Sequence, residues 1–284
     1  MNRGIGEVEA AQEIVPEALL PVAASVTRFG DVSTLVAVTV VVALLFDRDR
    51  GLFLFGAVIG GFALLSGLKA AFGLPRPPAE LHLITTGTTG FPSGHALGAT
   101  LVYGGLACLL RVGTRQARFA VAGVGIVLIS LSRIILGVHY LVDSVAGVLI
   151  AAGYLWGMGR YMRREPQWTL VAGAVLGVFA ILTGVVFGPT LQTTCVEAVC
   201  LDTDTAQVAM AGVGAVGAWT LGQMYGVRSI GLALLALGAL LGGGLVLTGS
   251  GTLTDLIATA LGAGAIVLAI EHGIVHRWVS SLWQ

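Results

Sequence analysis

The chain has 284 residues, of which 56% are hydrophobic and 11% are charged, and its net charge is zero. Soluble domains carry about 25% charged residues, so this composition excludes an ordinary soluble domain and indicates a membrane protein. The absence of net positive charge argues against nucleic-acid binding. The 42 glycines suit helices that pack closely through small residues.

Residues 1–30 form an acidic N-terminal segment. It lacks the basic start and the long apolar core of a signal peptide. The stretch from Glu13 to Arg28 contains two prolines and an apolar face. We therefore expect one or two short helices that lie at the membrane interface.

Five apolar runs in residues 31–165 predict a bundle of membrane-spanning helices. Each run approaches the roughly 20 residues that a helix needs to cross about 30 Å of hydrocarbon. The expected spans are residues 31–46, 51–73, 92–111, 119–136 and 138–158. The second span must end before the prolines at positions 75, 77 and 78, because proline cannot continue a helix.

Pro166 marks a boundary, and residues 166–284 form a second region to which the sequence assigns no role. Four further apolar runs follow this proline, at residues 168–187, 205–225, 229–247 and 253–270, and we find no motif in them. The predicted fold is all-α, a polytopic membrane bundle with a core of about five spans and about four C-terminal spans.

The placement of arginine predicts the orientation. Two loops carry three arginines each, Arg111, Arg115 and Arg118 in one and Arg160, Arg163 and Arg164 in the other. The positive-inside rule places both loops in the cytoplasm. The loops at residues 75–94 and 190–204 then face outside. Cys195 and Cys200 lie in the second of these outer loops, where a disulfide and two free thiols are both open.

Three short polar segments interrupt the core, and the alternating topology brings all three to the outer face. The first runs from Lys69 to Pro77, the second from Pro92 to His95, and the third from Ser132 to Asp143. Together they supply three cations, two histidines, one carboxylate and a Ser-Gly turn. These groups can hold a phosphate and attack it.

Lys69, Arg76 and Arg133 are the three cations of these segments. Charges in membrane helices are costly and mark functional sites. Three cations close together repel one another unless an anion lies among them, and arginine binds two phosphate oxygens at once. Alternatively, each side chain could extend its charged end to the membrane surface and bind nothing.

Ser93 and Gly94 open the third expected span. The N-terminus of a helix attracts anions through its dipole and its unpaired N–H groups, and glycine lets the backbone approach a ligand closely. Serine is equally common there as a plain helix cap, and His95 could be an interfacial histidine.

His139 and Asp143 are four residues apart at the start of the fifth expected span, and so share one helical face. A carboxylate there can accept the proton-bearing nitrogen of the imidazole and leave the other nitrogen as base or nucleophile. The pair alone is a weak signal, but its place beside the other two segments strengthens it.

Other histidines are weaker candidates. His272 and His276 are also four apart, but no third metal ligand lies nearby, so a helix end at the interface is the favoured interpretation. His82 lies between the first two polar segments and is either a substrate contact or a solvated loop residue. No metal-dependent motif is present in the sequence.

The three polar segments resemble the signature of the type 2 phosphatidic acid phosphatase superfamily. That signature is a Lys-x6-Arg-Pro, a Pro-Ser-Gly-His and a Ser-Arg-x5-His-x3-Asp, and the sequence matches all three motifs without a gap or substitution. The resemblance covers about residues 25–160 and does not reach residues 166–284. Membrane members of the family commonly have six core spans, whereas five are expected here.

The resemblance implies a phosphohistidine mechanism that needs no metal or other cofactor. His139 would be the nucleophile, Asp143 would orient it, and His95 would protonate the leaving group and then activate water. The residues that would hold the phosphoryl oxygens are Lys69, Arg76, Ser93, Gly94 and Arg133.

The expected substrate is a lipid phosphate or diphosphate, such as a polyprenyl diphosphate, phosphatidate or phosphatidylglycerol phosphate. The protein would be a multi-pass cell-membrane enzyme with its site on the extracytoplasmic face and membrane lipids as its partners. A lipid phosphotransferase remains an alternative, as does a lipid transporter or binding protein that uses residues 166–284. The similar vanadium haloperoxidases are soluble, unlike this chain.

Overall fold

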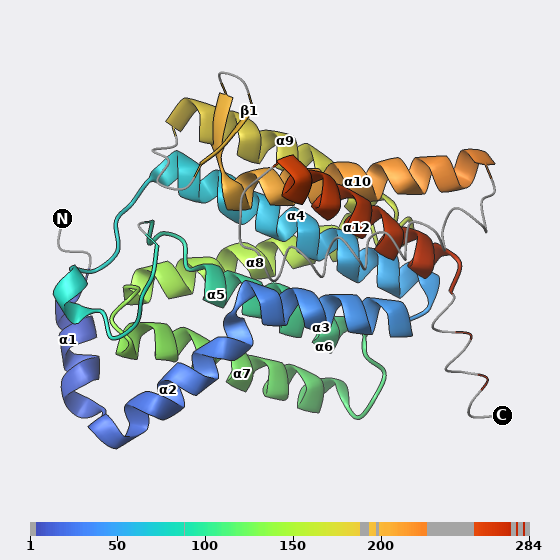
Figure 1. Cartoon of the computed structure of the whole chain (residues 1–284). Helices are drawn as coiled ribbons and strands as arrows, with labels where there is room; N and C mark the ends of the chain where they lie inside the picture. The colour runs from blue at the N-terminus through green and yellow to red at the C-terminus, as the bar shows by residue number, and fades with distance from the viewer. Residues whose placement is uncertain are drawn as a thin grey trace. The chain divides into compact units, whose positions relative to one another are not determined.

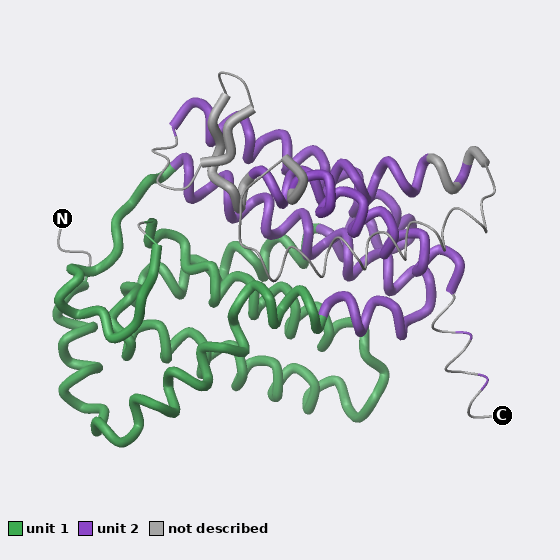
Figure 2. Tube along the Cα trace, in the orientation of Figure 1, with its two compact units in different colours: residues 1–38, 72–157 green, residues 39–71, 158–284 purple. Residues whose placement is uncertain are grey.

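The computed structural model describes residues 4–87, 89–187, 193–196, 199–225 and 253–273, together with Arg277 and Ser281. Helices dominate this part of the chain (Figure 1). It divides into two compact units, which Figure 2 shows in different colours. Unit 1 comprises Met1–Val38 and Phe72–Gly157, and unit 2 comprises Thr39–Ala71 and Met158–Gln284.

Unit 1 contains the N-terminal helices and the middle of the chain. Its elements are α1 (Ile5–Ile14), η1 (Glu17–Leu19), α2 (Leu20–Thr27), η2 (Arg28–Gly30), the first half of α3 (Val32–Leu45), η3 (Ala79–Leu81), α5 (Gly94–Ala99), η4 (Thr100–Gly104), α6 (Gly105–Leu109), α7 (Arg115–Ile135) and most of α8 (Leu141–Tyr161). Helices α1, α2 and α5 all pack against α7. Helix α7 is therefore the central element of this unit.

The N-terminal segment forms short helices, as the sequence predicts, and their expected place at the membrane interface stays a prediction. Residues Glu17–Gly30 and Val32–Leu45 are bent by 47° at the break between them, and together they are long and apolar enough for one span. The boundary expected near residue 30 is thus a bend within a candidate span. Helix α1 also contributes to the core, because Val8 is fully buried against Ile134 and Tyr140.

Local sequence signals set the ends of several helices in unit 1. Ser93 and Thr114 cap α5 and α7, since their hydroxyl oxygens accept hydrogen bonds from the backbone N–H groups of Ala96 and Ala117. Helix α7 ends at a turn in which Gly137 has a φ of +73°. A Cβ at Gly137 would lie 1.8 Å from the Leu81 carbonyl oxygen, so only glycine fits this turn.

The third expected span is shorter than residues 92–111. It begins at Gly94, passes through a π-helical stretch at Thr100–Gly104 and ends at Leu109. Gly147 of α8 allows this helix to begin close to α8, because a Cβ there would lie 2.7 Å from the Ser93 carbonyl oxygen. The second polar segment is therefore held directly against the start of α8.

Unit 2 contains the second half of α3, nearly all of α4 (Arg48–Phe72), α9 (Trp168–Phe187), β1 (Thr193–Val196), β2 (Val199–Asp202), α10 (Thr203–Tyr225) and α12 (Leu253–Glu271). Helix α10 packs against both α9 and α12. Arg48 of α4 donates to both carboxylate oxygens of Glu271 in α12, with Nη2 at 2.8 Å from Oε1. Glycine at position 56 lets α4 lie against Thr169 of α9.

The described part of the chain supports a membrane bundle but fewer spans than the nine expected. Four helices, α4, α7, α8 and α9, are long and apolar enough to cross a membrane, and the bent N-terminal pair would make five. The run at residues 229–247 lies outside the described residues. The nine-span count and the functional division at residue 166 remain predictions.

The loop that the arginine placement predicts to face outside contains a structural element that the sequence does not predict. Strands β1 and β2 pair in an antiparallel hairpin, with Cys195 opposite Cys200 in the register. The side chains of these cysteines lie outside the described residues. The disulfide between them therefore stays a prediction.

Candidate active site

Unit 1 brings together residues from all three polar segments. Arg76 lies in the loop after α4, His95 in the first turn of α5 and Arg133 near the end of α7. His139 lies in the turn before α8, and Asp143 lies in the first turn of α8. The convergence that the topology predicts is present for these residues.

His139 and Asp143 form a buried pair. The side chain of His139 is 1% exposed and that of Asp143 is fully buried, and His139 Nδ1 lies 3.4 Å from Asp143 Oδ2. The sequence places His139 within the fifth expected span, but in the structure His139 precedes α8, which begins at Leu141. The reason is that Asp143 Oδ2 also accepts the backbone N–H of Tyr140, at 3.1 Å, and so caps α8 at that residue.

Arg76 lies against the other nitrogen of the same imidazole. Its Nη1 is 2.8 Å from His139 Nε2 and donates to the Val138 carbonyl oxygen at the same distance, while its Nε donates to the Gly87 carbonyl oxygen at 2.6 Å. Arginine can only donate, so Nε2 is the acceptor and the proton of a neutral ring resides on Nδ1, facing Asp143. The lone pair of His139 therefore points at Arg76.

Arg76 keeps its positive charge at neutral pH. Burial lowers the pKa of its guanidinium to about 10, and the negative charge of Asp143 opposes that shift. A cation thus lies at the nitrogen that would attack a phosphorus atom.

Arg133 supplies a second buried guanidinium. It is 4% exposed, and its Nη1 donates to Thr27 Oγ1 at 2.8 Å. Its Nε–H is buried and has no hydrogen-bond partner within the described part of the chain. A buried donor without a partner is costly, and the oxygen of an anion would satisfy it.

Ser93 caps α5, which is the alternative that the sequence leaves open beside phosphate binding. Ser93 is fully buried, and its hydroxyl oxygen accepts from Ala96 N at 3.4 Å. Its backbone N–H donates to the Asp143 carbonyl oxygen at 3.0 Å, which ties the second polar segment to the third. The backbone of Ser93 therefore positions the site, whereas phosphate binding by its hydroxyl and by Gly94 stays a prediction.

His95 has a carboxylate partner that the sequence analysis missed. Its Nε2 lies 2.9 Å from Oδ1 of Asp31, the residue between η2 and α3. Arg76 and Arg133 also act electrostatically on His95. Three groups that carry or can carry positive charge thus converge from separate elements, an arrangement that an anionic ligand would stabilise.

The remaining two candidates are Lys69 and His82. Lys69 is in the last turn of α4 and belongs to unit 2, so its part in phosphate binding stays a prediction. His82 Nε2 lies 3.0 Å from the Pro77 carbonyl oxygen and so is bonded within its own loop. His276 lies outside the described residues, and its pairing with His272 is untested.

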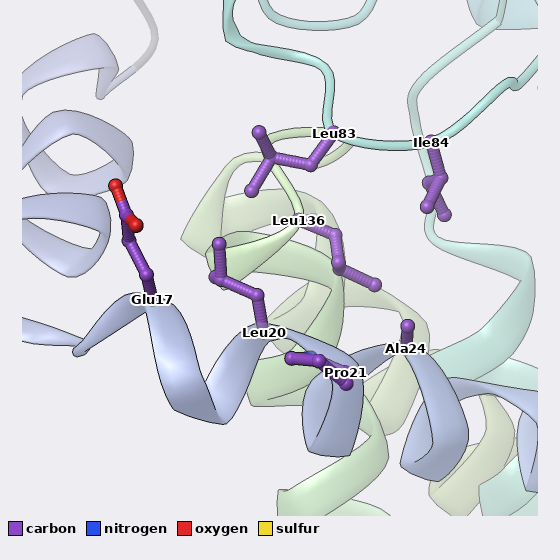
Figure 3. A pocket seen from close by; sticks show the side chains of 7 residues that line it. All are labelled: Glu17, Leu20, Pro21, Ala24, Leu83, Ile84 and Leu136. Carbon is purple, nitrogen blue, oxygen red and sulfur yellow. The ribbon is translucent and has the colours of Figure 1, made fainter.

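An apolar pocket of about 430 Å³ lies in the same unit. Figure 3 shows the residues that line it, which are Glu17, Leu20, Pro21, Ala24, Leu83, Ile84 and Leu136. The Leu83 N–H donates to the Leu136 carbonyl oxygen at 3.1 Å and joins two walls of the pocket. Both walls lie close in sequence to groups that bind Arg76. Gly87 follows Ile84, Val138 follows Leu136, and the carbonyl oxygens of Gly87 and Val138 accept hydrogen bonds from Arg76.

The comparison with protein families decides the identity of this core. The family model of the PAP2 superfamily matches residues 50–167. Residues 50–167 belong to the PAP2 superfamily. The resemblance carried by the three motifs is confirmed, and the PAP2 core contains every motif residue of the cluster.

Curated proteins and solved structures provide two further comparisons. No curated protein matches the sequence. A solved structure, the crystal structure of the first transmembrane PAP2 type phosphatidylglycerolphosphate phosphatase from Bacillus subtilis, is similar to this chain. The two share 28% sequence identity, the match covers 57% of this chain and 86% of that one, and the TM-score is 0.49.

The PAP2 core and the candidate spans together establish the class of the protein. The protein is a membrane phosphatase that acts on lipid phosphates, and residues 50–167 are its PAP2 core. The cluster of two arginines and two histidines, each histidine with its carboxylate, is the candidate active site of this enzyme.

Proposed function

We propose that this enzyme hydrolyses a phosphomonoester or diphosphate of a lipid through a phosphohistidine on His139, without a metal ion. One observation carries the proposal. The His139 imidazole has a carboxylate near Nδ1 and a cation at Nε2, so its lone pair is directed to the place where a phosphate would be held.

The first step transfers the phosphoryl group to the enzyme. The phosphate displaces Arg76 Nη1 from His139 Nε2, and the guanidinium binds phosphoryl oxygens instead. Nε2 attacks phosphorus as the bond to the lipid oxygen breaks, and protonated His95 gives its proton to that oxygen. Asp143 stabilises the positive charge that develops on the His139 ring.

The second step releases phosphate. His95, now neutral, takes a proton from a water molecule whose oxygen attacks the phosphorus, and the P–N bond to His139 breaks. Phosphoryl transfer mainly requires that negative charge on the equatorial oxygens be neutralised. Arg76 and Arg133 provide that charge in the described cluster, and Lys69 would add a third cation.

The pocket supports a lipid as the substrate. Six of its seven lining residues are apolar, and two of its walls continue along the chain to the carbonyl groups that bind Arg76. A phosphate held at Arg76 would therefore have an apolar surface beside it for the start of its hydrocarbon chain. Polyprenyl diphosphate, phosphatidate and phosphatidylglycerol phosphate all meet this requirement.

The positive-inside rule supports an extracytoplasmic site. The two arginine-rich loops at residues 111–118 and 160–164 follow α6 and α8 at the ends opposite to the motif residues. Protease or thiol-labelling access to the loop at residues 75–92 in sealed cells would report its side of the membrane.

The decisive experiment is phosphate release by the purified protein in detergent with EDTA present. The panel comprises a polyprenyl diphosphate, phosphatidate, phosphatidylglycerol phosphate and a soluble phosphate ester. We expect release from at least one lipid, insensitivity to EDTA and inhibition by vanadate, which occupies phosphate sites. Release that EDTA abolishes would contradict the metal-free mechanism. Transfer to an added alcohol instead of water would identify a phosphotransferase, and lipid movement without release would identify a transporter.

The pocket makes a separate prediction about chain binding. Replacing Ala24 by phenylalanine should fill part of the pocket and raise KM for a long-chain substrate about tenfold, because roughly two methylene groups lose burial at about 0.8 kcal/mol each. A short-chain soluble analogue should be hydrolysed with unchanged kcat/KM. Val22→Phe on the same helix is the matched control, since Val22 is 54% exposed and does not line the pocket. An equal effect on both substrates would contradict a chain-binding pocket.

A further inference from the structure

We infer that Asp31 is a positioning residue for His95, whose imidazole it orients and whose transferable proton it stabilises. The inference rests on the phosphatase mechanism proposed above and deepens it. Asp31 lies outside residues 50–167, which the family model matches, and outside all three motifs. The PAP2 core thus takes part of its proton-transfer machinery from the N-terminal segment.

The contact between the two side chains is short, and backbone hydrogen bonds hold Asp31 in position. His95 Nε2 lies 2.9 Å from Asp31 Oδ1, and the His95 side chain is 20% exposed. The backbone of Asp31 is fixed on both sides, because its N–H donates to the Arg28 carbonyl oxygen and its own carbonyl oxygen accepts from Leu35 N. The carboxylate is therefore held in place by the bend between η2 and α3.

Gly30 brings this bend against the imidazole ring. A Cβ at Gly30 would lie 2.9 Å from His95 Cδ2 and 2.7 Å from Ile129 Cγ2. The backbone before Asp31 can approach α5 and α7 this closely only because residue 30 has no side chain. Tyr103 of η4 adds to the fit, since its hydroxyl donates to the Phe29 carbonyl oxygen at 2.8 Å.

The charges around His95 give Asp31 its importance. Arg133 faces His95 from α7 and Arg76 faces it from the loop before α5, and both oppose a positive charge on the ring. Asp31 faces it from the bend before α3 and favours that charge. Burial of the ring is the strongest factor against that charge. A general acid must be protonated before the reaction, and Asp31 is the contact that favours the protonated ring against burial and the two arginines.

The geometry also assigns the two ring nitrogens. Asp31 accepts the proton of Nε2, which leaves Nδ1 as the nitrogen that exchanges a proton with the substrate. In the first step the Nδ1 proton passes to the leaving oxygen as the P–O bond breaks. In the second step Nδ1 accepts a proton from the attacking water.

Kinetics of Asp31→Asn provide the first test. We expect kcat for phosphate release to fall about 10- to 100-fold with little change in KM, because an orienting partner is lost and the phosphate cradle is intact. The alkaline limb of the pH–rate profile should move to lower pH. Asp31→Glu should recover most of the activity. Glu80→Gln is the matched control, since it removes an exposed carboxylate of unit 1 and should change neither quantity.

A double mutant separates positioning from a structural role. If Asp31 acts through His95, Asp31→Asn should cause no further loss in a His95→Ala background. Losses that multiply in the double mutant would overturn the inference. Gly30→Ala tests the same contact without removing a charge, and should lower kcat by pushing the bend away from the ring. A wild-type kcat in Gly30→Ala would count against the contact.

The last test needs no substrate. The imidazole signals of the five histidines can be followed by NMR during a pH titration of the detergent-solubilised protein, with the His95 signal assigned from its loss in His95→Ala. We expect the titration midpoint of His95 to fall in Asp31→Asn and to stay unchanged in Glu80→Gln. An unchanged midpoint in Asp31→Asn would overturn the inference. Failure of the wild-type protein to release phosphate from any lipid would refute the proposed function and leave this titration as an independent test of the pair.

Discussion

Replacing His139 by alanine is expected to abolish phosphate release, with a loss of at least about 10⁴-fold in kcat. The variant loses the proposed nucleophile, a ring that has the Asp143 carboxylate near Nδ1 and Arg76 at Nε2. The measurement is release of phosphate from the lipid that the wild-type enzyme hydrolyses best.

Trapping of the intermediate makes this test specific. Brief reaction with a ³²P-labelled lipid followed by alkaline quenching should leave label on the wild-type protein, as expected of phosphohistidine, and none on His139→Ala. His272→Ala is the matched control, because His272 lies at the end of α12 in unit 2, outside the PAP2 core. Label that persists in His139→Ala would show that another residue is the nucleophile.

Replacing Arg133 by alanine should lower kcat/KM by about 10³-fold or more, comparable to the effect of a transition-state arginine in other phosphoryl-transfer enzymes. The variant removes a buried guanidinium whose Nε–H has no protein partner among the described residues and whose Nη1 is anchored on Thr27. Arg133→Lys should recover only part of the loss, because an ammonium group cannot bind two oxygens in a fork.

The control for Arg133 lies on the same helix. Arg115→Ala removes an exposed arginine from the first residue of α7 and should leave kcat/KM within about twofold, as is usual for surface substitutions away from a site. Vanadate affinity should fall in Arg133→Ala together with kcat/KM. Wild-type vanadate binding in this variant would show that Arg133 does not hold the phosphoryl oxygens.

The sequence predicts the membrane helices well where apolar runs are long and bounded by proline or charge. The expected spans 51–73, 119–136 and 168–187 correspond closely to α4, α7 and α9. At the N-terminus composition does not distinguish an interfacial helix from half of a bent span, so the interfacial location stays a prediction. The β1–β2 hairpin is too short to produce a clear periodic pattern.

The same contrast holds for the candidate site. The sequence predicts the cluster of Arg76, His95, Arg133, His139 and Asp143 from motif spacing and topology. Because the spans alternate in direction, the end of the second, the start of the third and the junction of the fourth and fifth fall on the same face. The partners of these residues are harder to predict. Neither Asp31 nor Thr27 belongs to a motif. From the sequence, Asp31 is an ordinary charge at the start of a span and Thr27 is part of an apolar helix. The expected topology does place Asp31 at the outer end of its span, which is the one signal that could have pointed to His95.

The N-terminal segment has a consequence for how this enzyme can be divided or recombined. Gln12 donates to the carbonyl oxygens of Leu81 and Ile135, Thr27 anchors Arg133, and Asp31 holds His95. The segment therefore connects the loop that bears Arg76 to the end of α7. A truncated protein that begins at residue 50 would keep every motif but lose these contacts, and a chimaera between relatives must exchange the segment together with the core that it braces.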